Sequence, residues 1–206
     1  MGNASNTNDR PCVAGVLVGG QGVRLGRPKA TLALSGGSTL TEHVVGVARR
    51  QDHWIGEVVI LGRCADLPTS LTSLRRLEDV LSDGGPLAGL GALLEYAGQR
   101  WGLLLACDLP LLQAPLLQRL HDAIGPEHDA VAFRRPNRPY AFHACCALYH
   151  PRLLPAALHE LRQGRRSLHR LLVGGRAAVL LPTPAEEEML TNLNTPADYD
   201  RLRRRG

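Results

Sequence analysis

The chain has 206 residues, of which 44% are hydrophobic and 4% aromatic, and its formal net charge at pH 7 is +5. This length and composition predict one α/β domain with a sizeable aliphatic core. The positive charge favours acidic small molecules or nucleic acid as partners, whereas a membrane span is excluded because no apolar run approaches the roughly 18 residues that one needs.

Cysteine usage and the start of the chain indicate the compartment. The five cysteines are odd in number and include no C-x-x-C pair, so neither a disulfide framework nor a zinc knuckle is indicated. Residues 1–9 lack the charged start and apolar centre of a signal peptide. We therefore expect a cytoplasmic protein in which a disordered N-terminal arm, residues 1–11, precedes one domain at residues 12–206.

The first expected strand, residues 13–18, runs directly into a glycine-rich loop. Glycines let backbone N–H groups approach a phosphate chain where a Cβ atom would clash, and cationic side chains add further donors. The loop carries both kinds of residue: Gly19, Gly20, Gly22, Gly26, Arg24 and Lys29. It therefore predicts a site for a negatively charged, phosphorylated ligand.

Two common phosphate-binding motifs do not fit this loop. A P-loop needs Gly-Lys followed by Ser or Thr, but Gly26 is followed by Arg-Pro-Lys. A dinucleotide fingerprint needs a third glycine where Leu25 stands, and no acidic residue closes a second strand roughly 20 residues later. The loop therefore belongs to neither class.

The rest of the chain alternates between helical and extended patterns. A short extended piece at residues 30–34 is followed by Thr39 and Glu42, which have the spacing of a capping box for a helix ending near Arg50. Further strands are expected at residues 57–61, 74–78, 101–106, 129–133, 142–149 and 177–181. Further helices are expected at residues 87–98, 114–124, 151–163, 167–173 and 196–205. The alternation predicts a mainly parallel sheet with helices on both faces and sites at the carboxyl ends of its strands.

Two aspartates follow expected strands at that edge. Asp108 comes directly after the most apolar strand, where a carboxylate can share Mg²⁺ with phosphate oxygens. Taken alone, an aspartate before Leu-Pro is also ordinary turn chemistry. Asp79 follows the strand at residues 74–78, with Glu78 and Asp83 nearby, so any of these three carboxylates could be solvated surface charge. Asp108 is therefore the stronger metal candidate.

Two segments carry a resemblance to a known family. The glycine-rich loop resembles the signature Leu-x-Gly-Gly-x-Gly-x-Arg-x-Gly-x-x-Lys of nucleotidyltransferases that join a nucleoside monophosphate to a phosphorylated acceptor, and Leu17 to Lys29 match it position for position. The segment from Gly84 to Leu90, GGPLAGL, resembles the loop that presents backbone groups to guanine in molybdenum cofactor guanylyltransferases. The resemblance covers roughly residues 13 to 200.

The resemblance implies a single-domain, Rossmann-like nucleotidyltransferase fold that transfers GMP from GTP to the phosphate of molybdopterin and releases pyrophosphate. It implies Mg²⁺, or Mn²⁺ in its place, as cofactor, and molybdenum-insertion and molybdoenzyme-delivery proteins as partners, with neither membrane nor nucleic acid. The implied catalytic residues are Arg24, Lys29 and Asp108, with Asp108 as metal ligand. The implied nucleotide-binding residues are Leu17, Val18, Gly19, Gly20, Gly22, Lys29, Asp79, Gly85, Pro86, Leu87, Ala88, Gly89 and Asp108. The implied acceptor-binding residues are Arg165, Asn192 and Asn194.

Other interpretations stay open at this point. The same fold could serve a cytidylyl- or sugar-phosphate nucleotidyltransferase, or an inactive nucleotide-binding partner in cofactor delivery. The sequence Asn192-Leu-Asn194-Thr-Pro is also an ordinary helix start. Two positions depart from the family pattern, because Val18 stands where alanine is common and Leu61-Gly62-Arg63 stands where relatives offer an asparagine to the nucleotide. The arginines near the carboxyl terminus are interpreted as a solvated helix end.

Overall fold

The computed structural model of the chain describes residues 12–18, 31–34, 36–80, 84–136, 138 and 140–205. The N-terminal residues 1–11 and most of the glycine-rich loop, residues 19–30, lie outside the described residues. The predictions for Gly19, Gly20, Gly22, Arg24, Gly26 and Lys29, and for a disordered arm, therefore stay predictions. Leu17 and Val18 are the signature residues that the structure does describe.

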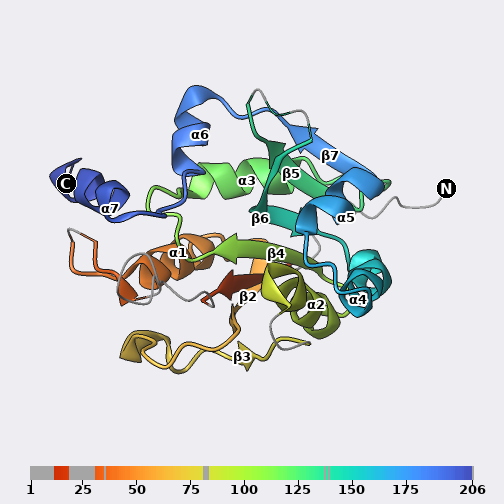
Figure 1. Cartoon of the computed structure of the whole chain (residues 1–206), viewed down its shortest axis with the longest axis horizontal. Coiled ribbons are helices and arrows are strands. Elements are labelled where there is room, and N and C mark those ends of the chain that lie inside the picture. Colours follow the sequence, from red (N-terminus) through yellow and green to blue (C-terminus); the bar gives the residue numbers. More distant parts are fainter. Residues whose placement is uncertain are drawn as a thin grey trace.

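Among the described residues, seven strands form one sheet in the order β3-β2-β1-β4-β6-β5-β7 (Figure 1). The strands are β1 (Cys12–Leu17), β2 (Ile55–Leu61), β3 (Arg76–Leu77), β4 (Trp101–Ala106), β5 (Ala130–Arg134), β6 (Phe142–Tyr149) and β7 (Ala177–Leu180). Strand β6 runs antiparallel to both of its neighbours, and the other pairs are parallel. The prediction of a mainly parallel α/β sheet is confirmed.

Helices cover both faces of this sheet. The α-helices are α1 (Leu40–Arg49), α2 (Gly85–Ala97), α3 (Ala114–Asp122), α4 (Leu154–Arg162), α5 (Leu168–Gly174), α6 (Pro184–Met189) and α7 (Pro196–Arg205), and the 3-10 turns are η3 (Thr69–Leu71) and η4 (Pro151–Leu153). Helices α1 and α3 pack in one apolar cluster, and α2, α4 and α5 pack in the other. In β4, Leu104 enters the second cluster while Leu103 and Leu105 enter the first, because successive side chains of a strand point to opposite faces.

The predicted capping box begins α1. The backbone N–H of Glu42 donates to Thr39 Oγ1 at 3.2 Å, and the backbone N–H of Thr39 donates to Glu42 Oε2 at 2.7 Å. Two N-terminal amides are thereby satisfied by side-chain oxygens, and the chain leaves the extended conformation at Thr39. The helix then buries Val44, Val45 and Val47 against the sheet.

Three elements differ from the prediction. The strand expected at residues 74–78 is only Arg76–Leu77, because this edge strand pairs with β2 through two residues alone. The helix expected at residues 151–163 begins as the 3-10 turn η4 before continuing as α4. Helix α6 was not predicted, because none of its six residues is buried and it therefore has no apolar periodicity.

The strand register brings several strand ends to one edge of the sheet. Leu17 at the end of β1 pairs with Leu61 of β2 and with Ala106 of β4, and Leu61 pairs with Leu77 of β3. Because β6 is antiparallel, its first residue, Phe142, arrives at this same edge beside Arg134 of β5. The edge therefore collects residues from both halves of the chain.

Candidate active site

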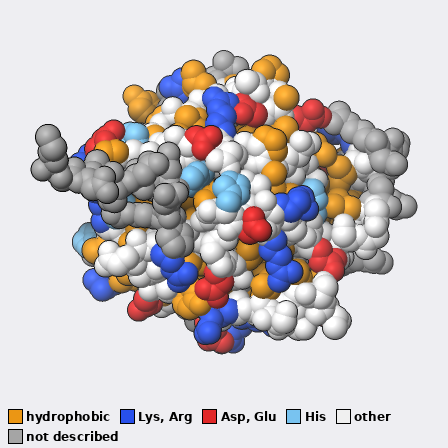
Figure 2. Space-filling view, turned by 180° about the vertical axis from the view of Figure 1, so that it is seen from behind, with side chains coloured by type: hydrophobic (Ala, Val, Ile, Leu, Met, Phe, Trp, Pro, Cys, Tyr) orange, Lys and Arg blue, Asp and Glu red, His pale blue; other side chains and the backbone are white. Residues whose placement is uncertain are grey.

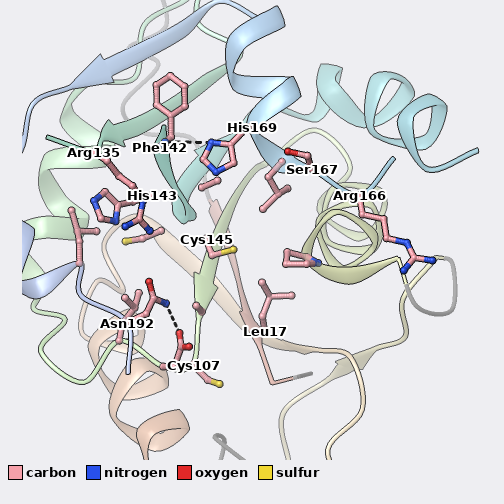
Figure 3. A pocket seen from close by; sticks show the side chains of 18 of the residues that line it. Leu17, Cys107, Arg135, Phe142, His143, Cys145, Arg166, Ser167, His169 and Asn192 are labelled. Atoms are coloured by element: carbon pink, nitrogen blue, oxygen red, sulfur yellow. Dashed lines mark hydrogen bonds between the residues drawn. The ribbon is translucent and has the colours of Figure 1, made fainter. Parts of the chain in front are cut away.

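A cavity of about 490 Å³ opens at this carboxyl edge (Figure 3). Its walls come from the ends of β1 and β4, the start of β6, the residue after β5, the amino end of α2, the segment leading into α5 and the segment after α6. Polar and apolar groups are mixed on these walls, and Asp108 is the acidic residue among those that line it. The position agrees with the general placement of ligand sites in open α/β sheets, beyond the carboxyl ends of the strands.

Asp108 is held in place from two directions. The residue is 9% exposed and lies two positions beyond the end of β4. Asn192 Nδ2 donates to Asp108 Oδ1 at 2.6 Å, which is one of the dashed lines in Figure 3, and the backbone N–H of Leu193 donates to the Asp108 carbonyl oxygen at 2.9 Å. The structure therefore joins the predicted metal ligand to a residue that was predicted to contact the acceptor.

Of the predicted nucleotide-binding residues that the structure describes, only some line the cavity. Leu17, Val18 and Pro86 line it, and Gly85 is exposed at the start of α2 with φ +62°, a conformation that favours glycine. The next three predicted residues, Leu87, Ala88 and Gly89, are buried. The side chains of Leu87 and Ala88 pack α2 against the sheet, and Gly89 lets the helix lie close to it because it has no side chain.

Gly89 allows α2 to approach the end of β1. A Cβ atom at this position would lie 2.6 Å from Leu17 Cδ2, closer than side chains tolerate, and 3.7 Å from Asp79 Oδ1. Asp79 therefore lies beside α2 and Leu17, although it is not among the residues that line the cavity. Partial burial raises the pKa of Asp79. The structure thus places Asp79 next to the predicted nucleotide side, in a supporting position.

The opposite wall carries two histidines and two arginines that were not predicted as site residues. They are Arg135, His143, Arg166 and His169. The His143 side chain is 3% exposed, and its Nε2 lies 2.9 Å from Glu187 Oε2 of α6. Burial lowers the pKa of His143, the charge of Arg135 lowers it further, and Glu187 opposes both effects. His143 is therefore a neutral hydrogen-bonding group near pH 7.

His169 fixes the backbone at the start of β6. Its Nδ1 accepts a hydrogen bond from the backbone N–H of Phe142 at 3.3 Å, so the neutral ring carries its proton on Nε2 (Figure 3). Burial and the charge of Arg135 lower the pKa of His169. The sequence contained weak signals for this wall, namely the basic loop after residue 133 and a histidine within an apolar strand.

The predicted acceptor residues are separated by the structure. Asn192 lines the cavity, whereas the Asn194 side chain donates to the Asn192 carbonyl oxygen at 3.5 Å. The Arg165 guanidinium is engaged by Glu160 through two hydrogen bonds of 2.7 Å, and these interactions lower the pKa of Glu160 to about 2. The neighbouring Arg166 lines the cavity in place of Arg165. An acceptor contact by Arg165 stays a prediction.

Two of the three cavity thiols are poor nucleophiles near neutral pH. Cys107, Cys145 and Cys146 line the wall, and burial raises the pKa values of Cys145 and Cys146 to about 12. Thiols with such pKa values stay protonated near neutral pH and are poor metal ligands. Within the described part of the chain, no three His, Cys, Asp or Glu side chains are grouped to hold a metal ion. Asp108 is the carboxylate on the cavity wall that could contribute to a metal site.

The fold and this site are those of a nucleotidyltransferase: a mainly parallel sheet, a cavity at its carboxyl edge with one carboxylate, and a glycine-rich, cationic sequence directly after β1. Residues 14–178 match the family described as the MobA-like NTP transferase domain, and the chain belongs to that family.

Several relatives are similar over nearly the whole chain. A "probable molybdenum cofactor guanylyltransferase" of Opitutus terrae is 33% identical over 207 residues, covering 97% of this chain and 98% of the relative. A "molybdenum cofactor guanylyltransferase" of Pseudomonas entomophila is 30% identical over 186 residues, covering 90% and 94%. Because these relatives match almost the whole chain, their similarity to it is not confined to the glycine-rich loop.

Solved structures confirm the fold without choosing a substrate. The molybdopterin-guanine dinucleotide biosynthesis protein A of Archaeoglobus fulgidus superimposes with a TM-score of 0.74 at 23% identity, covering 93% of this chain and 97% of that one. A 4-diphosphocytidyl-2C-methyl-D-erythritol synthase of Anaerococcus prevotii reaches a TM-score of 0.70 at 13% identity, covering 98% and 99%. The same architecture is therefore found in proteins whose names refer to different bases.

Two surface observations bear on the expected partners. No helix in the part of the chain that the structure describes is both long and apolar enough to cross a membrane. On the face seen in Figure 2, the described acidic and basic side chains are interspersed and are not gathered by sign. Nucleic acid binding normally uses a gathered basic patch or stripe.

Proposed function

We propose that the protein transfers GMP from GTP to the phosphate of molybdopterin, giving the guanine dinucleotide cofactor and pyrophosphate. The observation that carries the proposal is the place of Asp108, in a cavity whose wall includes the first residues of the glycine-rich signature, Leu17 and Val18. The names of the relatives support the choice of substrates. The segment GGPLAG at the amino end of α2 supports guanine as the base.

The two sides of the cavity suit two substrates. Leu17, Val18 and Pro86 adjoin the predicted phosphate-binding loop and would face the nucleotide. The wall with Arg135 and His143 would face the acceptor, since a phosphorylated pterin offers both an anion and hydrogen-bonding ring edges. Asp108 lies on the floor contributed by β4, and β4 is bordered by β1 on one side and by β6 on the other. The reacting phosphates of the two substrates would meet there.

The residues present fit a magnesium ion that is shared with the substrate. Asp108 places one oxygen-donating carboxylate on the cavity wall, which suits Mg²⁺ because this ion usually keeps waters and substrate phosphates as its other ligands. When bound, the ion would neutralise phosphate charge as a Lewis acid. Mn²⁺ has the same preference for oxygen ligands and should substitute for it.

The chain's own residues would bind and orient the reactants. An oxygen of the acceptor phosphate forms a bond to the α-phosphorus of GTP, and the bond from that phosphorus to the oxygen of the β-phosphate breaks, so that pyrophosphate leaves. No general base is required, because the acceptor is already an anion. Arg135 and Arg166 would stabilise the acceptor's charge from the cavity wall, while Arg24 and Lys29 are predicted to stabilise the leaving pyrophosphate.

We also propose a cytoplasmic location, with molybdenum-insertion and molybdoenzyme-delivery proteins as partners. The five cysteines are all free of disulfides, which fits a reducing compartment.

The test is an incubation of the protein with Mg²⁺, molybdopterin and each of the four nucleoside triphosphates, followed by measurement of pyrophosphate and dinucleotide. We expect product with GTP alone. Product with CTP would identify a cytidylyltransferase, and GTP binding without pyrophosphate release would identify an inactive binding partner. Asp79→Asn should retain more activity than Asp108→Asn, because Asp79 lies outside the cavity wall. The reverse order would move the metal to Asp79.

A further inference from the structure

The segment from Thr183 to Leu193 is fastened to the body of the protein at several points. Thr183 and Glu186 form a capping box at the start of α6, and Glu186 also forms an ion pair with Arg119 of α3. Glu187 holds His143 at 2.9 Å. These polar contacts hold a helix that has no fully buried residue, together with Met189, which packs against the first apolar cluster.

The residues after α6 continue this attachment up to the cavity. Leu190 is 0% exposed and Leu193 is 2% exposed, and the N–H of Leu193 is bonded to the Asp108 carbonyl oxygen. Asn192 lies between these two anchors, so its backbone is already immobilised before its side chain makes any contact. Little further conformational entropy is lost when its amide bonds to Asp108, and the bond is correspondingly effective.

The Asn192 amide is suited to orienting a metal-binding carboxylate. Its Nδ2 lies 2.6 Å from Asp108 Oδ1, a short distance for a hydrogen bond to an anion, and this contact sets the plane of the carboxylate within the cavity. A cationic donor at the same place would compete with a metal for the negative charge. A neutral amide fixes the orientation and leaves the full charge available.

We infer that Asn192 is a positioning residue that acts through Asp108, orienting the carboxylate for the metal, in addition to forming part of the cavity wall. The inference rests on the proposed function. It differs from the acceptor contact that the sequence resemblance implies, because an acceptor contact would change the affinity for molybdopterin, whereas a positioning role changes the affinity for the metal. Thr191, the preceding residue, is exposed, does not line the cavity and donates its hydroxyl to the Glu187 carbonyl oxygen, so it provides a control in the same segment.

The test measures Mn²⁺ binding by electron paramagnetic resonance in the presence of GTP, without acceptor. Asn192→Ala should weaken Mn²⁺ binding roughly 10- to 100-fold, the usual effect of removing a residue that orients a metal ligand. Asn192→Leu, which keeps the volume but not the donor, should weaken it equally, and Thr191→Ala should leave it unchanged. In the transfer assay, Asn192→Ala should lower kcat and leave the KM for molybdopterin within about twofold, because only the orientation of the metal ligand has changed.

Unchanged Mn²⁺ affinity in Asn192→Ala, together with a raised KM for molybdopterin, would overturn the inference and leave an acceptor contact. Equal losses in Asn192→Ala and Thr191→Ala would also overturn it, since a general disturbance of the segment would then be the cause. Failure of the proposed function is a separate result: the wild-type protein would bind Mn²⁺ and GTP and yet form no dinucleotide. If Asn192→Ala does not fold, as judged by circular dichroism, Asn192→Leu alone decides between these outcomes.

Discussion

Replacing Gly89 by alanine should destabilise the protein and disturb the cavity wall at once. In this position within α2, the new Cβ atom would lie 2.6 Å from Leu17 Cδ2. Leu17 would have to shift, and it lines the cavity beside Val18. Gly46 in α1 is the matched control, because a Cβ atom there meets only Arg50 Nη1 at 3.5 Å, an ordinary contact.

The two substitutions share one favourable effect and differ in one unfavourable effect. Alanine in place of glycine inside a helix stabilises by about 1 kcal/mol. Overpacking of a closed contact costs about 1–3 kcal/mol, and this cost applies to Gly89→Ala alone. We therefore expect Gly46→Ala to raise the free energy of unfolding by about 1 kcal/mol and Gly89→Ala to lie about 1–3 kcal/mol below it. For a chain of this size, each kcal/mol changes Tm by roughly 2–4 °C.

Urea unfolding followed by circular dichroism measures both values, and GTP titration of each variant measures the effect on the cavity. Gly89→Ala should bind GTP more weakly than Gly46→Ala, which should match the wild type. If Gly89→Ala were as stable as Gly46→Ala and bound GTP normally, the close packing of α2 on β1 would not constrain the site, and the geometric reasoning would be refuted.

Three further outcomes are expected. Asp108→Asn should fold normally but lose at least ~100-fold in turnover, measured as pyrophosphate release, because metal stabilisation of a phosphoryl group contributes several kcal/mol and each ~1.4 kcal/mol is tenfold in rate; near-normal turnover would remove Asp108 from the mechanism. Lys29→Ala should lower kcat more than it weakens GTP binding, since charge at the leaving pyrophosphate is greatest in the transition state; a change confined to KM would make Lys29 a uniform binder. Burial lowers the pKa values of His43, His143 and His169 in the folded state, so the unfolded chain binds more protons below the unfolded value of 6.5. The stability that these histidines contribute should therefore be fully present above pH ~6.5 and be lost as the pH falls through their lowered pKa values. His43→Gln should reduce the pH dependence of the free energy of unfolding measured with urea. An unchanged pH dependence would contradict the contribution assigned to His43.

The strand and helix pattern could be predicted where local apolar patterns are strong. Residues 101–106 form an apolar run with one glycine, residues 142–149 are apolar apart from His143, and both strands have the predicted ends. Helix α6 could not be found from periodicity, because none of its residues is fully buried, although Thr183 and Glu186 had the spacing of a capping box. That box was the one local signal available.

The site could be predicted only in part, because its contacts join distant residues. Asp108 and Asn192 are separated by 84 positions, and His143 and Glu187 by 44. No periodicity relates such positions, so the sequence indicated Asp108 by its strand and Asn192 by resemblance without indicating that they touch. The exchange of Arg165 for Arg166 on the cavity wall likewise depends on Glu160, whose ion pair is a property of the folded helix end.

The strand order also has a consequence for how the chain assembles on the ribosome. Strands β1 to β4 come from the first half of the chain and occupy one side of the sheet, while β5 to β7 occupy the other, and the two groups meet only where β4 pairs with β6. The first group leaves the ribosome before the second has been synthesised, because the chain emerges from its amino terminus. The cavity is lined by residues of both groups, among them Leu17 and His143. A nascent chain therefore has no complete cavity until the strands and helices made last have docked.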